Sequence, residues 1–381
     1  FRWPERTVLA LTRTPDTIPL QQLQQDLRTR LGRRVDIRTG AGGAAHVRVH
    51  RCGEIAGPDG FRLTVGPDGI TVETDTDAGV YYGIQLVRDM LRLHGERIPA
   101  CRVTDHADFA RRGVYLDCSR GKVPTLDTLH ALVERLAAWR INELQLYVEN
   151  VFAFRQHPTI PRGFSPLTPD EILDLQEHCK QHHVRLAPSL ASFGHMETIL
   201  ALPKYRELGE MPGTNDYPGG TTLCPTDPRS VRLMRDLYSE FVPLFEPVDF
   251  NVCGDETWEL GKGRSQAEAE QHGVARLYID FIKQLHELVA GHGKRMNMWA
   301  DIVLKHPEEL GNLPPGICLL NWDYDARGER FKYCRDLAEA GLPFMVCTGT
   351  SSWGRHAADT DNAMQNVINF VKLARKHGAE G

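Results

Sequence analysis

Apolar residues in the first hundred positions recur with two different periods, which divide this region into strands and helices. Residues 20–31 carry leucine at the spacing of one helix face, and residues 78–93 follow a similar pattern. Gly66-Pro67-Asp68-Gly69 separates two short apolar runs and combines residues that favour turns, so it predicts a hairpin. Strands are expected at residues 7–11, 45–50, 60–65, 69–74 and 97–103. The pattern predicts a small α+β domain over residues 1–106.

From residue 107 onward, short apolar runs alternate with longer amphipathic helices. This alternation is typical of βα units and a parallel sheet. Strands are expected at residues 113–118, 143–148, 185–189, 249–253, 294–298, 317–321 and 344–347. A closed (β/α)8 TIM-like barrel has eight strands, whereas the sequence shows seven. We therefore predict an α/β fold with a barrel over residues 107–381. Its eighth strand is missing from this sequence, or the barrel is open, or another chain fills the gap.

The length and the composition fit this division. A chain of 381 residues suits a barrel with a smaller partner domain, and 41% hydrophobic with 25% charged residues is a globular balance. The net charge is −5 and charges of both signs are interspersed, so neither nucleic acid nor an anionic membrane is an expected partner. No apolar run is long enough to cross a bilayer.

The cysteines and histidines show neither a disulfide framework nor the spacing of a metal site. Nine cysteines are scattered without a Cys-x-x-Cys pair, and no His-Glu-x-x-His motif occurs. We therefore expect free thiols, a reducing and cytoplasmic location, no catalytic metal and no cofactor. The lack of an Asn-x-Ser/Thr sequon agrees with this location. The sequence begins with Phe1 rather than Met, so a removed leader and secretion stay open.

Polar and aromatic residues gather directly after the expected barrel strands, at the end where such barrels place their active sites. Aromatic rings stack on the apolar faces of sugar rings, while carboxylates and arginine hydrogen-bond the hydroxyls. The set therefore indicates a carbohydrate site. Its members are Asp117, Ser119, Arg120, Glu149, Asn150, Ser192, Gly194, His195, Gly254, Asp255, Glu256, Trp299, Asp301, Trp322, Asp323, Tyr324, Ser352 and Trp353.

Asp255 and Glu256 are the sharpest feature of this set. Two adjacent acids at the mouth of a buried strand are costly unless they are paired or used. An alternative is a helix N-terminus, where acidic residues interact favourably with the helix dipole, but the strand context and the preceding Gly254 favour catalysis. A conventional retaining glycosidase sets an acid and a nucleophile on opposite sides of the bond. Adjacent acids fit instead a mechanism in which the substrate supplies its own nucleophile.

Several segments, taken in order, resemble glycoside hydrolase family 20, the β-N-acetylhexosaminidases. Asn251-Val252-Cys253-Gly254-Asp255-Glu256 resembles the Gly-Asp-Glu signature of that family. The similar segments elsewhere are residues 79–85 in the small domain, 112–120 and 142–147 on the first two barrel strands, and Phe193-Gly194-His195. The stretch 255–265 is more similar to the smaller bacterial and intracellular branch of the family.

The resemblance implies a retaining exo-hydrolase of terminal β-linked N-acetylglucosamine or N-acetylgalactosamine. By this resemblance Glu256 is the general acid and base, and Asp255 holds the acetamido N–H and supports an oxazolinium intermediate. The other implied sugar contacts are Arg112 for ring hydroxyls, Trp299 and Trp322 as walls of the acetamido pocket, and Tyr324 for the acetamido oxygen.

The sequence departs from the family pattern after the second barrel strand. Glu149-Asn150 stands where the family commonly has Thr-Asp-Asp, so Asn150 occupies the place of the acid that pairs with the histidine of the third strand. That histidine is His195, and Glu149 is the candidate to compensate. We expect all three beside the substrate, although a plain loop role for His195 stays open. Trp353 is expected to be a subsite wall.

Two other functions fit the same sequence. Asn150 suggests a glycosidase of this fold with altered specificity, for example for a sulfated or substituted amino sugar. A non-catalytic carbohydrate-binding barrel is the second alternative, against which the intact Asp255-Glu256 pair argues. In each case the expected partner is a glycan or an amino-sugar oligosaccharide, and an oligomer is compatible with the sequence.

Overall fold

The computed structural model describes residues 1–381 except 12–16, 41–43, 54 and 214–216. The chain divides into two compact units. The first contains Phe1–Ala110 together with Leu132–Asn142 and Lys180–Val184, and the second contains Arg111–Ala131, Glu143–Cys179 and Arg185–Gly381. Within the described ranges, none of the helices combines the length and the apolar character that a membrane span requires.

The first unit is built on a six-stranded sheet with the order β2-β1-β3-β5-β4-β6. β1 pairs in parallel with β2 and β3, while β4 is antiparallel to β5 and β6. The predicted hairpin is confirmed, because Gly66 pairs with Gly69 where β4 turns into β5. The elements are β1 (Arg6–Leu11), α1 (Ile18–Leu31), β2 (Arg34–Thr39), β3 (Val47–Arg51), β4 (Phe61–Gly66), β5 (Gly69–Thr74), α2 (Asp77–His94) and β6 (Cys101–Asp105).

Helix α2 packs tightly on β4 and β5 because two of its residues have no side chain. A Cβ atom at Gly79 would lie 2.4 Å from the carbonyl oxygen of Gly60, and one at Gly83 would lie 2.5 Å from Val72. Thr76 caps the helix, since its hydroxyl accepts the backbone N–H of Gly79 at 3.0 Å. The glycines of this helix therefore serve close packing on the sheet.

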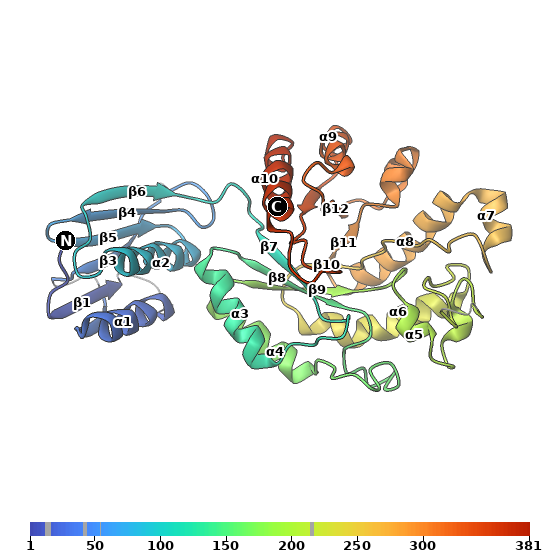
Figure 1. The fold of residues 1–381 in the computed structure, drawn as a ribbon, viewed down its shortest axis with the longest axis horizontal. Coiled ribbons are helices and arrows are strands. Elements are labelled where there is room, and N and C mark those ends of the chain that lie inside the picture. The colour runs from blue at the N-terminus through green and yellow to red at the C-terminus, as the bar shows by residue number, and fades with distance from the viewer. Residues whose placement is uncertain (12–16, 41–43, 54, 214–216) are drawn as a thin grey trace. The chain divides into compact units, whose positions relative to one another are not determined.

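The second unit contains an all-parallel sheet of seven described strands in the order β13-β12-β11-β10-β9-β8-β7. The helices of this unit lie around the outside of the curved sheet (Figure 1). The strands are β7 (Gly113–Asp117), β8 (Glu143–Val148), β9 (Arg185–Leu190), β10 (Asp249–Asn251), β11 (Arg295–Trp299), β12 (Cys318–Trp322) and β13 (Phe344–Cys347). All seven predicted barrel strands are therefore confirmed, each within two residues at either end.

The helices alternate with these strands, as the sequence predicts. They are α3 (Leu126–Ala138), α4 (Pro169–Gln181), α5 (Glu197–Leu200), α6 (Pro228–Phe241), α7 (Gln266–His272), α8 (Val274–Gly291), α9 (Tyr333–Glu339) and α10 (Thr360–Lys376). Short 3₁₀ turns occur at Arg206–Leu208, Val242–Leu244, Val303–Lys305, Pro307–Asn312 and Glu329–Lys332.

The sheet is open between its first and last strands, because β7 and β13 do not pair with each other among the described residues. Residues at positions 113, 115 and 117 of β7 are accordingly exposed. Glu380 and Gly381 lie at this opening. The N–H of Glu380 donates to Phe344 at 2.9 Å and its carbonyl accepts from Arg111 at 3.3 Å, while Gly381 accepts from Val346 at 3.1 Å. The last two residues therefore hydrogen-bond both to β13 and to the residue that leads into β7.

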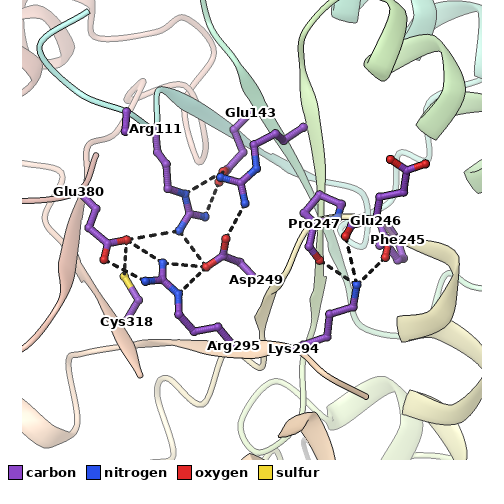
Figure 2. Close-up of polar contacts among 12 residues, drawn as sticks. Arg111, Glu143, Phe245, Glu246, Pro247, Asp249, Lys294, Arg295, Cys318 and Glu380 are labelled. Atoms are coloured by element: carbon purple, nitrogen blue, oxygen red, sulfur yellow. Dashed lines mark hydrogen bonds and ion pairs between the residues drawn. The ribbon is translucent and has the colours of Figure 1, made fainter. Parts of the chain in front are cut away.

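A buried network of charges joins the amino ends of the strands (Figure 2). Arg111 donates two hydrogen bonds of 2.9 Å to the two carboxylate oxygens of Glu143, and its third nitrogen lies 3.2 Å from Asp249. Arg185 and Arg295 bind Asp249 at 2.5 and 2.8 Å. These residues precede or begin β7 to β11, so the network fixes five strand ends against one another.

The positive and negative groups in this network offset one another. Burial alone raises the pKa of Asp249, but Arg111, Arg185 and Arg295 outweigh it and hold that pKa below its usual range. Arg295 also forms a two-pronged pair with Glu380, at 2.9 and 2.7 Å. Because Arg111, Glu143 and Asp249 are all buried, loss of one partner leaves an opposite charge without its counter-charge.

Arg111→Met should lower the free energy of unfolding by about 3–5 kcal/mol, because Glu143 then keeps a buried charge without its main partner. Urea denaturation followed by tryptophan fluorescence measures this. Arg276→Met is the matched control, since Arg276 pairs with Asp280 on the exposed side of α8. That change should cost about 0–1 kcal/mol. Equal losses in the two variants would contradict the structural role of the buried network.

Candidate active site

The chain makes a sharp turn where β10 ends, and this turn carries the two acids. Cys253, Gly254 and Glu256 all have positive φ angles, of 63°, 82° and 49°. The strand therefore stops at Asn251 instead of continuing to residue 253 as the sequence predicts. The phenol of Tyr278 donates to the carbonyl of Gly254 at 2.8 Å and helps hold the turn. Left-handed backbone at residues with a Cβ is strained and concentrates at functional sites.

The loop after β9 lies directly against this turn. A Cβ atom at Gly194 would lie 2.2 Å from the carbonyl oxygen of Asp255, so only glycine allows the two backbones to approach this closely. The approach brings the next residue, His195, to both acids. Its Nε2 lies 3.2 Å from the Asp255 carboxylate and 3.5 Å from that of Glu256. One imidazole nitrogen thus contacts both members of the predicted catalytic pair.

His195 is protonated at neutral pH in this setting. Burial lowers the pKa of its imidazole, but the hydrogen bond and the charge of Asp255 outweigh burial and raise the pKa to about 9. The other ring nitrogen, Nδ1, lies 3.4 Å from Nη2 of Arg120. Both ring nitrogens are donors in the protonated form, so Asp255 rather than Arg120 holds the ring.

Arg120 connects His195 to the end of β8. Its Nη1 lies 2.8 Å from the carboxylate of Asp117 and its Nη2 lies 3.1 Å from that of Glu149. Glu149 is buried and also accepts the phenol hydrogen of Tyr147 at 2.7 Å. Burial raises the pKa of Glu149, and Arg120 and Tyr147 partly offset this. The half-exposed guanidinium of Arg120 is therefore anchored by two carboxylates at the carboxyl end of the sheet.

Arg112 lies elsewhere, and the prediction that it shares a pocket with Glu256 is wrong. It directly precedes β7, so it lies at the amino end of the parallel sheet, whereas Asp255 and Glu256 follow β10 at the carboxyl end. The arginine that the structure brings to the acids is Arg120, which follows β7. Arg120 belongs to the set of polar residues predicted after the strands, but the sequence pattern gave it no individual role.

Asn150 and Glu149 take different places in the site. Asn150 is completely buried, and neither atom of its amide has a hydrogen-bond partner among the described residues. Glu149, its neighbour, reaches Arg120 and adds a negative charge near His195 that favours the imidazolium. Within this pair, Glu149 is therefore the residue that joins the charged network.

Trp299 and Asp301 approach the acids from β11. The ring of Trp299 is almost fully buried and meets the edge of Tyr115, with ring centres 5.1 Å apart. Asp301 accepts the backbone N–H of Glu256 at 3.3 Å. Asp301 belongs to the set of polar residues predicted after the strands, but the sequence pattern gave it no individual role.

The three aromatic residues predicted after β12 and β13 meet in one cavity. Tyr324 lies between the other two: its ring centre is 4.9 Å from that of Trp322 and 4.8 Å from that of Trp353. The cavity has a volume of about 440 Å³, and neither Asp255 nor Glu256 is part of its lining. Burial raises the pKa of Tyr324, and Cys347 and then the charges of the two acids raise it further. The Tyr324 phenol is thus within electrostatic reach of the acids.

Trp322 has a neighbour on each face of its indole. Besides Tyr324, which is stacked on it, the guanidinium carbon of Arg330 lies 3.6 Å from the ring centre. A guanidinium this close leaves no room on the same face for a ring centred 4.9 Å away, so the two lie on opposite faces. Trp322 therefore offers an edge rather than a face to a ligand, and its predicted role as a pocket wall depends on that edge.

An NMR titration should find the pKa of His195 near 9. Asp255→Asn should lower this pKa by at least about one unit, because burial, which lowers the pKa, is then no longer outweighed by the charge of Asp255. A raised histidine pKa stabilises the folded protein, fully below about pH 6.5, and this contribution is lost as the pH rises through about 9. Asp280→Asn, a change at an exposed pair on α8, is the control and should leave the titration unchanged. An unchanged pKa in Asp255→Asn would remove Asp255 as the partner.

Family models and known proteins agree with this architecture. The model for glycosyl hydrolase family 20, domain 2, matches residues 1–106, and that for the family 20 catalytic domain matches residues 109–373. A β-N-acetylhexosaminidase of Cellulomonas fimi is 24% identical over 91% of this chain and 70% of its own length. A lacto-N-biosidase of Bifidobacterium bifidum is also 24% identical, over 79% of this chain and 27% of its own. The structure of Flavobacterium johnsoniae chitobiase matches 93% of this chain and 58% of its own, with a TM-score of 0.78 and 20% identity. The chain belongs to glycosyl hydrolase family 20.

Proposed function

We propose that this chain is a retaining exo-β-N-acetylhexosaminidase, which removes terminal β-linked N-acetylglucosamine or N-acetylgalactosamine from glycans. The contact of one His195 nitrogen with both Asp255 and Glu256 carries this proposal. Asp255 and Glu256 are consecutive residues of one turn after β10, and both reach the same imidazole nitrogen. The acid and the nucleophile of a conventional retaining enzyme stand on opposite sides of the scissile bond. The adjacent pair therefore favours a nucleophile supplied by the substrate.

The 2-acetamido group of the sugar supplies that nucleophile. Its carbonyl oxygen attacks the anomeric carbon, the bond to the leaving oxygen breaks, and Glu256 gives that oxygen its proton. Asp255 accepts the acetamido N–H and stabilises the positive charge of the resulting oxazolinium ion. Water, deprotonated by Glu256, then attacks the anomeric carbon and opens the oxazolinium ring. The two successive inversions at this carbon give overall retention of configuration.

The neighbouring groups maintain these two roles. His195, as an imidazolium, donates to Asp255 from Nε2 and holds its carboxylate in place. Arg120 replaces Arg112 as the group that binds the hydroxyls of the terminal sugar, because its guanidinium is half-exposed beside His195. Trp299 walls the acetamido group, and the phenol of Tyr324 donates to its oxygen. The relative named as a β-N-acetylhexosaminidase supports this substrate class.

Glu256→Gln should lower kcat by about 10²–10⁴-fold on an N-acetylglucosaminide with a poor leaving group, because the amide N–H is too weakly acidic to protonate the leaving oxygen. Release of free sugar measures turnover, and circular dichroism confirms folding. Glu268→Gln is the matched control, since Glu268 is exposed on α7. It should retain full activity. Near-normal turnover by Glu256→Gln on this substrate would exclude Glu256 as the general acid. An activated aryl leaving group would be a misleading assay, since it needs little protonation.

Removal of the acetamido group from the substrate should abolish activity. The matching β-glucoside has the same leaving group and ring but no internal nucleophile, so hydrolysis should fall below detection at equal concentration. Comparable turnover of the glucoside would disprove the substrate-assisted mechanism, as would a sugar trapped covalently on any side chain. A panel that includes 6-sulfated amino sugars separates altered specificity from the proposed function, and 4-epimeric amino sugars distinguish N-acetylglucosamine from N-acetylgalactosamine within it.

A further inference from the structure

Asp301 is a buried carboxylate beside the two acids, and the proposed mechanism leaves it unused. It is 3% exposed and lies two residues beyond β11. Its Oδ2 accepts the backbone N–H of Glu256 at 3.3 Å. Its Oδ1 is buried and has no hydrogen-bond partner among the described residues. A carboxylate in such a place is expensive to keep ionised, and buried polar atoms without partners are uncommon in folded proteins.

Groups from four parts of the fold act on the charge of Asp301. Burial and then the charge of Asp255 raise its pKa, while the Glu256 N–H, Arg330 and Lys305 lower it, and the net result is a pKa of about 6. Tyr278 of α8 also interacts with this charge, since Asp301 and Asp255 both raise the pKa of its phenol. Asp301 therefore changes charge between mildly acidic and neutral pH.

The atom that Asp301 binds belongs to a strained residue. Glu256 has a φ of 49°, in the left-handed region that a side chain disfavours. Its carboxylate is already 35% exposed, and its contact with His195 is long, at 3.5 Å. The carbonyl of Glu256 accepts the N–H of Trp258 at 2.8 Å, and its own N–H donates to Asp301, so Asp301 is the side chain that holds this backbone N–H. An ionised acceptor holds an N–H more strongly than a neutral one.

We propose that Asp301 is a positioning residue for the general acid, which as an anion holds the backbone of Glu256 in its left-handed conformation and loosens this hold when it is protonated. This inference depends on the proposed function, because it concerns the orientation of Glu256. Asp301 is buried and contacts the backbone of Glu256. Its effect should therefore appear in kcat rather than in the affinity for the sugar.

The same arrangement lowers the stability of the folded protein at neutral pH. The folded state keeps the Asp301 proton up to about pH 6, whereas an unfolded chain releases it near the ordinary aspartate value of about 4. Between these values the folded state binds more protons, so the free energy of unfolding falls as the pH rises. Above about pH 6 the free energy of unfolding stays at this reduced value. A carboxylate with a purely structural role would instead raise the free energy of unfolding at neutral pH.

Asp301→Asn tests both consequences, because the amide oxygen can still accept the Glu256 N–H but carries no charge. At pH 7.5 kcat should fall about tenfold relative to the wild type with little change in KM, and the melting temperature should rise. At pH 5.0 the wild-type residue is itself mostly neutral in the folded protein, so the two kcat values should converge. The difference between the two melting temperatures should be about half of that at pH 7.5, because the unfolded chain releases the proton near pH 4. Calorimetric titration with N-acetylglucosamine should give equal Kd values for both proteins at pH 7.5.

Asp227→Asn is the matched control. Asp227 is also buried and accepts a backbone N–H at 2.9 Å, but it caps α6 and pairs with Arg229 and Arg264. Those partners hold its pKa below the usual range. Its substitution should lower the melting temperature at pH 7.5 and leave the ratio of kcat values unchanged between pH 5.0 and 7.5.

Two results would overturn the inference. One is a kcat ratio between the wild type and Asp301→Asn that stays constant from pH 5.0 to 7.5. The other is an Asp301→Asn protein that is less stable than the wild type at pH 7.5. Failure of the proposed function looks different: the wild type would then not release N-acetylglucosamine from any substrate at either pH. The melting temperatures would in that case still report whether Asp301 carries a destabilising charge.

Discussion

The pairing of buried charges at the amino ends of the strands is the constraint on which the second unit depends. Arg111, Asp249 and Glu143 lie in the interior, and Arg185, Arg295 and Glu380 extend the network outward, so that three arginines face three acids. In a parallel sheet, the amino ends and the carboxyl ends are related by the length of each strand. A network that fixes five amino ends therefore also fixes where the opposite ends lie, and the residues that follow them.

The charged residues at the two ends of the sheet are arranged differently. At the amino end each buried acid has an arginine partner, and the arrangement serves stability. At the carboxyl end three acids, Asp255, Glu256 and Asp301, lie within one turn and its neighbour, and the imidazolium of His195 contacts the first two. Charges that repel one another and strained backbone at Cys253 and Glu256 are unfavourable for folding. The paired amino end is the part of the unit that can offset them.

The sequence predicted the strands of the barrel and the acid pair because both depend on local pattern. It missed β2, in which only Val35 is buried, because an edge strand with one buried residue has no apolar period. The family resemblance placed Arg112 in the site although it precedes β7, whereas the rule that sites lie after the strands of a parallel barrel favours Arg120, which follows β7. The interaction of Arg330 with Trp322 joins a loop to a strand end, which apolar spacing does not encode.

Gly194 limits how the loops of this site can be exchanged with those of related enzymes. Because its missing side chain lets one loop rest on the carbonyl of Asp255, the segments after β9 and β10 interlock at the level of their backbones. Neither can be replaced by a longer or bulkier loop from a related enzyme without separating His195 from its acids. Loop grafting in this fold would have to move both segments as a single module. Diversity of specificity is more easily introduced at the edge of the sheet, where β13 leads into the aromatic residues.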